Sequence, residues 1–220
     1  MYLIIWIYYK LLKKKILRNH KMINDSKYTN VAIALHWLIG IAILFMFILG
    51  WFMTELPRET PKTTSFDIFH LGLFIWEVAE EQSQRTFYFN LHKSIGLTIL
   101  MLVVLRMYWR FTHRPPAFLS SMKLWEKRLA KATHHSLYLL MFVIPLSGII
   151  MSAASKYGIK WFGIKVIPGF DDKAVRELFY EFHEIFGILL LLLLLFHTLG
   201  AIKHSIIDKD GTLRRMWFRK

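Results

Sequence analysis

Cysteine is absent from the 220-residue sequence, and this absence excludes several kinds of site. Without thiols the chain forms no disulfide, binds no iron–sulfur cluster through thiolates and has no C-x-x-C-H motif for covalent attachment of haem. The sequence also lacks any G-x-G-x-x-G, Walker or G-x-S-x-G pattern, so nucleotide binding and serine hydrolysis have no local support. Any metal centre must therefore use histidine, methionine or carboxylate ligands.

Long apolar segments dominate the sequence instead. Apolar residues make up 55% of the chain and the mean hydropathy is +0.37, which is too hydrophobic for one soluble core and suits a small integral membrane protein. The segments do not alternate with the period of two that membrane-barrel strands require. We therefore expect an all-α integral membrane four-helix bundle. The segments long enough to span are 31–53, about 90–109, about 134–153 and about 183–202.

The net charge of +14 is unevenly distributed along the chain. Residues 106–131 carry seven basic residues and one acid, and residues 203–220 carry six basic residues and two acids. The connections 54–93 and 154–184 have four basic against six acidic residues, and five of each. By the positive-inside rule, the 106–131 loop and both termini are predicted to be cytoplasmic. The charge thus indicates membrane topology rather than nucleic-acid binding.

The first 21 residues form a short apolar run followed by basic residues. A secretory signal has the opposite order, and the run is too short to span a membrane. The segment is either an interfacial basic extension or, as we favour, upstream codons translated from a misplaced start, with Met22 as the first residue. Residues 22–220 then form one transmembrane domain.

The connections between the predicted helices differ in character. The long 54–89 loop contains a half-apolar stretch, 66–78, which we expect to lie on the membrane surface as an amphipathic helix. Residues 123–133 are predicted to form a separate interfacial helix. The loop after residue 154 contains several glycines and a proline, and we expect it to be irregular.

Two histidines lie in the last apolar segment. His183 and His197 are 14 residues apart, which on an α-helix is a rise of roughly 21 Å and a return to within about 40° of the same face. A hydrocarbon core is about 30 Å thick, so one helix face carries an imidazole near each membrane surface. Ionisable groups at such depths mark functional sites by default.

Two further histidines lie at matching depths in the first two segments. Depth pairs His36 with His197 near the cytoplasmic surface, and His92 with His183 near the outer surface. Each pair can supply both axial ligands of a haem iron, which leaves no open position and favours electron transfer over oxygen binding. The sequence therefore predicts two haem b groups. The alternative is that these histidines are polar packing residues in a protein without redox function.

Glycine recurs after the same histidines. Gly40, Gly96 and Gly187 each follow a predicted ligand by four residues, and Gly200 follows His197 by three. Residues four apart share a helix face, so each glycine leaves bare backbone beside an imidazole, where a porphyrin edge would lie. The other explanation is close helix–helix packing through small residues.

Four more polar residues near the cytoplasmic surface are candidate contacts of a quinone or of haem propionates. His204, Lys203 and His134 can each donate a hydrogen bond to a quinone oxygen. The guanidinium group of Arg106 suits a propionate. The alternative explanation is ordinary contact with lipid headgroups, to which long basic side chains extend from within a membrane.

Several segments of the chain resemble the bacterial cytochrome b561 family. The resemblance covers residues 26–217, and it departs from the family in the N-terminal extension and in the long 54–89 loop. The segments that carry it are YTNVAIALHW (28–37), LHKSIG (91–96), LY (137–138) with PLSG (145–148), and the stretch from His197 through KH (203–204) to DGTLRRM (210–216).

The resemblance implies a four-helix, di-haem b-type protein of the bacterial inner membrane that exchanges electrons with quinone. Carried over residue by residue, the family's haem ligands are His36, His92, His183 and His197 in this sequence. Some members of the family are described as oxidising superoxide and passing the electron to ubiquinone. Related di-haem subunits serve hydrogenases or formate dehydrogenases as membrane anchors.

Two redox functions therefore remain open. The first is an oxidoreductase that takes electrons at the outer face, from a donor such as superoxide, and reduces ubiquinone or another quinone. Lys156, Lys160 and Lys165 in the second outer loop could steer a small anion toward the outer haem; equally, they are ordinary solvated charges. The second is a haem-bearing anchor subunit that docks a periplasmic electron-transfer protein on the 54–89 loop.

Overall fold

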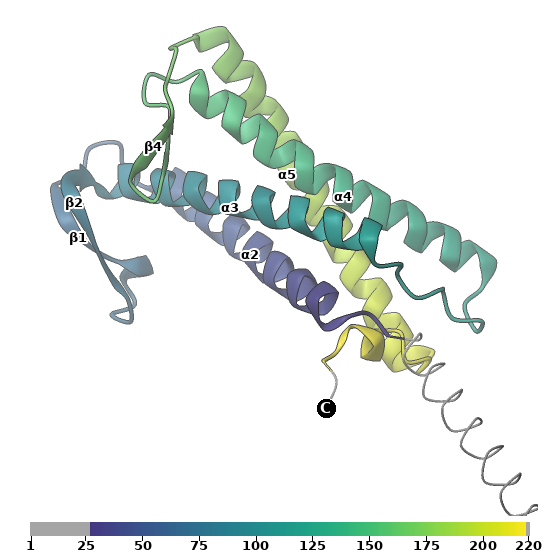
Figure 1. Cartoon of the computed structure of the whole chain (residues 1–220). Coiled ribbons are helices and arrows are strands. Elements are labelled where there is room, and N and C mark those ends of the chain that lie inside the picture. Colours follow the sequence, from purple (N-terminus) through teal and green to yellow (C-terminus); the bar gives the residue numbers. More distant parts are fainter. Residues whose placement is uncertain (1–26, 219–220) are drawn as a thin grey trace, which may run out of the picture.

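Four long helices form an elongated bundle in the computed structural model, which describes residues 27–218 (Figure 1). All four are long and apolar enough to cross a membrane. They are α2 (Asn30–Glu55), α3 (Gln84–Thr112), α4 (Leu124–Ala153) and α5 (Lys173–Ile202). The predicted helical membrane bundle is thus confirmed, whereas the cytoplasmic location of the termini stays a prediction. The predicted extension 1–21 lies outside the described residues.

Helices α2, α3 and α5 begin at side-chain caps rather than where hydropathy rises. The side chains of Thr29, Ser83 and Asp172 accept hydrogen bonds from backbone N–H groups three residues later, at 3.3, 3.2 and 3.0 Å. Such caps satisfy donors that a first helical turn leaves free. As a result, α3 and α5 each extend beyond the apolar segments predicted for them.

The residues predicted to form a helix at 123–133 are helical from Leu124, but they do not form a separate helix, because α4 runs without a break from Leu124 to Ala153. Its first turn is fixed by the carboxylate of Glu126, which accepts a hydrogen bond of 2.8 Å from the Lys123 N–H. The following residues are good helix formers, so nothing ends the helix before the apolar segment. The helix also continues through Pro145.

The predicted amphipathic helix at 66–78 is also wrong. Strands β1 (Lys62–Asp67) and β2 (Ile75–Ser83) form an antiparallel hairpin, with a short 3-10 turn η1 (Ile68–His70) at its tip. Phe69 and His70 have φ values of 55° and 57°, a left-handed conformation that ends any right-handed helix. The fold is therefore mostly, not entirely, helical.

The segment after α4, predicted to be irregular, contains a second hairpin made of β3 (Ile159–Trp161) and β4 (Ile164–Ile167). It is docked on α3. The Lys93 ammonium donates to the Gly158 carbonyl at 3.0 Å, and the Trp161 indole N–H donates to Thr98 Oγ1 at 3.1 Å. Gly158 has a φ of +65°, and a Cβ there would lie 2.3 Å from the Ile167 carbonyl oxygen, so the turn requires glycine.

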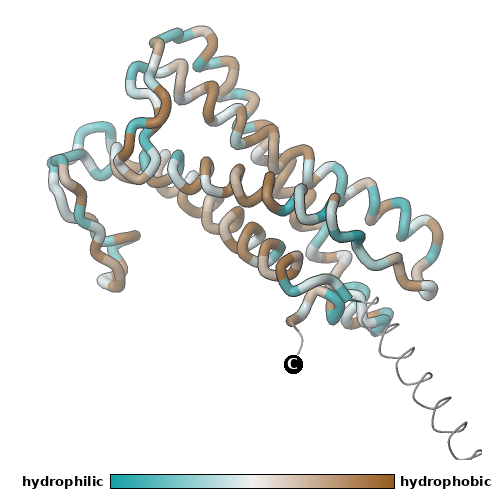
Figure 2. Tube along the Cα trace, in the orientation of Figure 1, coloured by the Kyte–Doolittle hydropathy of each residue, from teal (hydrophilic) through white to brown (hydrophobic). Residues whose placement is uncertain are grey.

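The two hairpins lie at one end of the bundle, here called the hairpin end, and residues 203–217 lie at the other, the C-terminal end (Figure 1). Within the bundle, α4 packs chiefly against α5, and α2 against α3. Apolar residues predominate along the helices, and hydrophilic residues are more frequent at the ends and connections (Figure 2). The central core is made of Ile39, Ile43, Ile99, Val103, Leu137, Leu140 and Leu190.

Candidate haem sites

At the hairpin end, the structure places His92 of α3 beside His183 of α5. The centroids of the two rings are 6.2 Å apart, and the ring planes meet at 71°. Metal–imidazole bonds are about 2.0 Å long, so two rings on opposite sides of one metal ion have centroids roughly 6 Å apart. His92 Nδ1 is buried and has no hydrogen-bond partner among the described residues. A buried polar atom without a partner is uncommon and calls for an explanation such as a ligand.

Hydrogen bonds hold the His183 ring in one tautomer. Its Nδ1 lies 3.0 Å from the Ile144 carbonyl oxygen and 3.0 Å from Ser147 Oγ. Because a carbonyl only accepts, the ring hydrogen belongs on Nδ1, which leaves the lone pair of Nε2 free. Metal-binding histidines are typically oriented by such a bond from the other ring nitrogen. His183 is thus prepared to bind a metal through Nε2.

Two glycines of neighbouring helices bring their backbone close to the His183 and His92 rings. A Cβ at Gly148 of α4 would lie 3.1 Å from His183 Cε1, and a Cβ at Gly50 of α2 would lie 3.6 Å from His92 Cε1. The four-residue spacing after the histidines singled out neither glycine, although Gly148 ends the PLSG segment of the family resemblance. Their signal is glycine on the helix facing a histidine, which cannot be recognised before the helices are paired.

The glycines that follow the histidines have a different environment. A Cβ at Gly40, Gly187 or Gly200 would meet no neighbouring atom within 4 Å among the described residues, and one at Gly96 would meet only the methyl group of Met46, at 3.6 Å. Close helix–helix packing therefore does not explain the first three. The space beside them is what a flat cofactor edge requires.

At the C-terminal end, three histidine rings gather from three helices. The ring centroids of His36 (α2) and His197 (α5) are 6.0 Å apart, and those of His134 (α4) and His197 are 5.2 Å apart. Depth along the helices predicts the first neighbour relation but not the second. His197 therefore has two imidazole neighbours within reach of a shared metal ion.

Arg106 of α3 occupies the space beside His36. Its guanidinium group donates to the Ala32 carbonyl at 3.0 Å and to the Tyr138 hydroxyl at 3.1 Å, and its Nη2 lies 3.3 Å from His36 Nδ1. A guanidinium group only donates, so His36 Nδ1 is the acceptor and its ring hydrogen lies on Nε2. Metal binding through Nε2 therefore requires Arg106 to move away from this nitrogen.

Lys203 and His204 belong to a cluster of charges beyond this pair. The Lys203 ammonium contacts the buried carboxylate of Glu126 and lies 2.7 Å from Asp208 Oδ2. His204 Nδ1 lies 2.9 Å from an oxygen of Asp208 and 2.8 Å from one of Asp210. The sequence analysis does not predict these contacts with acids. Glu126 in particular is distant in sequence, and only the fold brings it to Lys203. The cluster ties the chain after α5 to the start of α4.

Asp210 lies outside the membrane-spanning helices and is almost fully buried, with 7% of its side chain exposed. Burial acts to raise the pKa of its carboxyl, but hydrogen bonds from Thr212 and His204 outweigh burial and hold the pKa below its usual range. The charged carboxylate therefore helps to fix residues 208–212.

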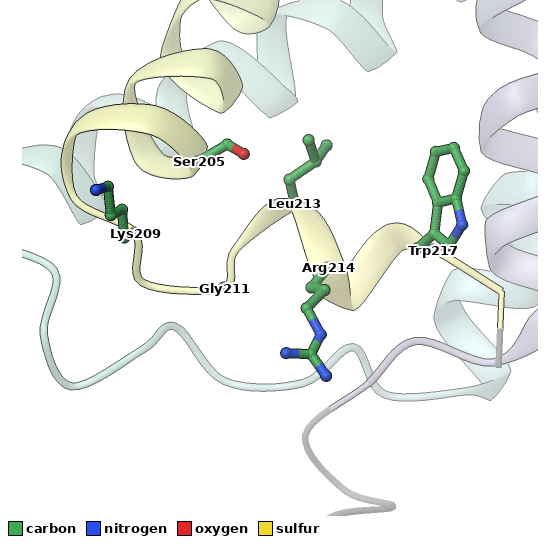
Figure 3. Close-up of a pocket in the computed structure, with 6 residues that line it drawn as sticks. All are labelled: Ser205, Lys209, Gly211, Leu213, Arg214 and Trp217. Carbon is green, nitrogen blue, oxygen red and sulfur yellow. The ribbon is translucent and has the colours of Figure 1, made fainter. Parts of the chain in front are cut away.

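A pocket of about 330 Å³ lies next to this cluster, on the C-terminal segment (Figure 3). It contains none of the predicted site residues, although Ser205 directly follows His204. A ligand site of a small molecule begins at about this size. The lining residues are Ser205, Lys209, Gly211, Leu213, Arg214 and Trp217.

Comparison with known families gives one match over nearly the whole described chain. The sequence model described as prokaryotic cytochrome b561 matches residues 27–219. This range includes all four helices and the four histidines that form the two ring pairs.

Individual relatives agree with this match. Cytochrome b561 homolog 2 of Escherichia coli (strain K12) is 33% identical over 193 residues, which cover 87% of this chain and 91% of that protein. Cytochrome b561 homolog 1 of the same strain is 25% identical over 200 residues, covering 89% and 99%. A protein named probable superoxide oxidase CybB, from Yersinia pestis, is 23% identical over 198 residues, covering 89% and 98%.

Proposed function

The chain belongs to the prokaryotic cytochrome b561 family, and from this premise we propose that it carries electrons across the bacterial inner membrane through two b-type haems, to or from a quinone. The family makes it a multi-pass, haem-binding membrane protein of electron transport. Bound haem supplies reversible one-electron chemistry. The observation that carries the proposal is the pairing of both α5 histidines, at two depths, with histidines of α2 and α3.

His92 and His183 are the proposed ligands of the haem at the hairpin end. Three observations support them: the ring spacing of 6.2 Å, the unpartnered Nδ1 of His92, and the hydrogen bond that leaves His183 Nε2 free. By the charge distribution, this end faces the periplasm. We therefore assign it the outer haem.

His36 and His197 are the proposed ligands at the C-terminal end, which then holds the inner haem. Ligation through His36 Nε2 places the ring hydrogen on Nδ1. A hydrogen-bond acceptor for that hydrogen is the Ala32 carbonyl one turn earlier, which now accepts from Arg106. We propose that Arg106 turns to a haem propionate, with which a guanidinium group forms a paired, charge-assisted bond. His134 then lies beside the inner haem without binding the iron.

Quinone is proposed to bind at the C-terminal end. His204 Nδ1 is held by two carboxylates, so Nε2 is the ring atom left to face a quinone oxygen. Lys203 can contribute only by exchanging one of its carboxylate partners. The adjacent pocket, of about 330 Å³, has the size of a small ligand site and could hold a quinone ring. The basic residues that line the pocket favour the reduced, more anionic form of the quinone.

Replacing His204 with alanine should leave both haem spectra intact and slow quinone reduction several-fold. The substitution removes a quinone contact but no proposed iron ligand. Stopped-flow reduction of quinone by the purified variant measures the effect, with haem content as the control. Unchanged kinetics at full haem content would move the quinone site, most plausibly to the outer haem.

The two candidate functions differ in the electron donor. Superoxide is one candidate, because the Yersinia pestis relative is named a probable superoxide oxidase. Of the three lysines considered for steering an anion, Lys160 is paired with Glu80 at 3.3 Å, which weakens its attraction. The alternative is an anchor subunit that receives electrons from a periplasmic protein docked over the hairpins. The two hairpins offer such a protein a structured platform.

Purified protein should contain two haems per chain, both removed by acid–acetone extraction because no cysteine is available for covalent attachment. Haem-to-protein stoichiometry and a dithionite-reduced minus oxidised spectrum test this. A stoichiometry of one, or haem that resists extraction, would contradict the two-haem proposal. Superoxide- and quinol-dependent kinetics on the isolated chain then separate the oxidoreductase from the anchor subunit.

A further inference from the structure

The tip of the β1–β2 hairpin is strongly apolar and almost uncovered. Leu71, Leu73, Phe74 and Ile75 are 60%, 71%, 71% and 68% exposed. Residues 68–76 include no acid, lysine or arginine, and Figure 2 shows hydrophobic residues gathered toward the turn of this hairpin. A contiguous apolar patch of this kind marks a contact with a membrane or a partner rather than with water.

The tip lies beside the membrane-spanning part of α2, not beyond its end. The Phe69 ring is 5.0 Å from the Phe52 ring and 5.8 Å from the Phe45 ring, measured between centroids. Phe52 and Phe45 precede the last residue of α2, Glu55, by about 5 and about 15 Å along the axis. A helix of 26 residues is about 39 Å long, some 9 Å more than a hydrocarbon core. With α2 centred in the membrane, the level of Phe69, between those of Phe52 and Phe45, lies within the hydrocarbon core, near its edge.

Several backbone donors at the tip are paired within the protein. Ile68 N–H donates to the Phe74 carbonyl at 2.9 Å, and Phe69 N–H donates to the Tyr88 hydroxyl at 2.8 Å. Gly72 N–H donates to both carboxylate oxygens of Asp67, each at 3.0 Å. Unpaired N–H groups are expensive in a membrane, whereas water would satisfy them at an ordinary loop tip. This pairing suits an apolar environment.

Apart from Asp67, whose carboxylate accepts the hydrogen bonds from Gly72, the acidic residues of this hairpin lie away from its tip. Glu77, Glu80 and Glu81 all follow the apolar stretch on β2, and Glu80 pairs with Lys160 of the second hairpin. Between the two zones is Trp76, stacked on Phe162 with ring centroids 6.2 Å apart. Tryptophan is enriched at the membrane–water boundary. The sequence of zones along the strand is therefore apolar, aromatic, then acidic.

We propose that residues 71–75 are inserted into the lipid leaflet at the hairpin end, beside α2, with Trp76 at the boundary and the acidic part of β2 in water. Elements lying in an interface bury apolar side chains about 5–10 Å into the headgroup and acyl boundary, which agrees with the level of Phe69. The partner is lipid, because the apolar tip is packed through Phe69 against a membrane-spanning helix, at the level of that helix's apolar part. This inference is independent of which residues bind haem.

The absence of native cysteine makes the test direct, because single cysteines can be introduced without removing others. Phe74→Cys reports on the tip, and Glu81→Cys, exposed on the same strand, is the matched control. Each variant carries an environment-sensitive fluorophore in nanodiscs, so that both membrane faces are accessible. Quenching is measured with nitroxide lipids and, separately, with aqueous iodide. Leu73→Cys replaces the tip variant if the visible haem spectrum of Phe74→Cys differs from that of the unmodified chain.

We expect nitroxide lipids to quench the fluorophore at position 74, and iodide to quench it at least several-fold less than at position 81. Equal iodide quenching at both positions, without lipid quenching at 74, would place the tip in water. Protection of position 74 from both quenchers would mean that protein covers the tip, for example a second copy of the chain. Either of these two results overturns the proposal.

Discussion

Replacing His183 or His92 with alanine should lower the haem content from two to about one per chain, because bis-imidazole haem loses one axial ligand. The remaining haem should keep the spectrum and potential of the C-terminal-end site. Replacing His36 or His197 should give the reverse pattern. A redox titration followed at the visible absorption bands, combined with the haem-to-protein ratio, distinguishes the two sites.

The control for these variants is His134→Ala. Its ring lies 5.2 Å from that of His197, closer than His36, yet in our proposal it does not bind iron. This variant should retain both haems. Loss of the C-terminal-end haem in His134→Ala, with retention in His36→Ala, would instead make α4 the source of the second ligand. Loss of the same haem in His36→Ala and His183→Ala would show that the assumed pairing is wrong.

Replacing Gly148 with valine should displace His183 and remove most of the hairpin-end haem. A Cβ alone at this position would lie 3.1 Å from Cε1 and 3.3 Å from Nδ1 of the His183 ring, and the valine methyl groups need further space. The ring cannot yield easily, because its Nδ1 is hydrogen-bonded to Ile144. We expect about one haem per chain and the spectrum of the His183→Ala variant.

Gly50→Ala provides the matched control. Its Cβ would lie 3.6 Å from His92 Cε1, an ordinary van der Waals contact. Alanine is also a better helix former than glycine by about 1 kcal/mol, so this variant should fold normally and retain both haems. Gly148→Ala should be intermediate. Full haem content in Gly148→Val would show that the His183 ring is free to move and that Gly148 has no part in positioning it.

The helices and the histidine depths are predictable from sequence because they depend on local properties. A span of about 20 apolar residues can satisfy its backbone in a membrane only as a helix, and depth along a helix is a matter of counting residues. The pairing of His36 with His197 follows from opposite helix directions. What depth does not reveal is the lateral arrangement, which brings His134 against His197 as well.

The prediction of a helix in place of the β1–β2 hairpin fails for a physical reason. The stretch 66–78 has enough apolar residues for an amphipathic helix, but the Asp67 carboxylate binds the Gly72 N–H and turns the chain. Phenylalanine and histidine then adopt positive φ values that neither residue favours by itself. Packing of Phe69 against α2 and α3 stabilises that conformation, and those contacts are distant in sequence.

The electrostatic partners at the C-terminal end were likewise hidden. Lys203 and His204 were expected to offer free hydrogen bonds to a ligand, whereas three carboxylates already engage them. Two of these acids, Asp208 and Asp210, follow within a few residues, but the direction of their side chains depends on the π-helical turn Lys203–Ile207. The third, Glu126, belongs to another helix.

The position of α5 in the chain has a consequence for biosynthesis. Each of the two histidine pairs takes one member from α5, and the segment after it returns to α2, where the Trp37 indole donates to the Met216 carbonyl at 2.8 Å. A ribosome that stalls before α5 therefore leaves three inserted helices without a complete pair. Under the proposed ligation, haem loading is then a late event that requires α5, and a product truncated before α5 is expected to retain neither haem.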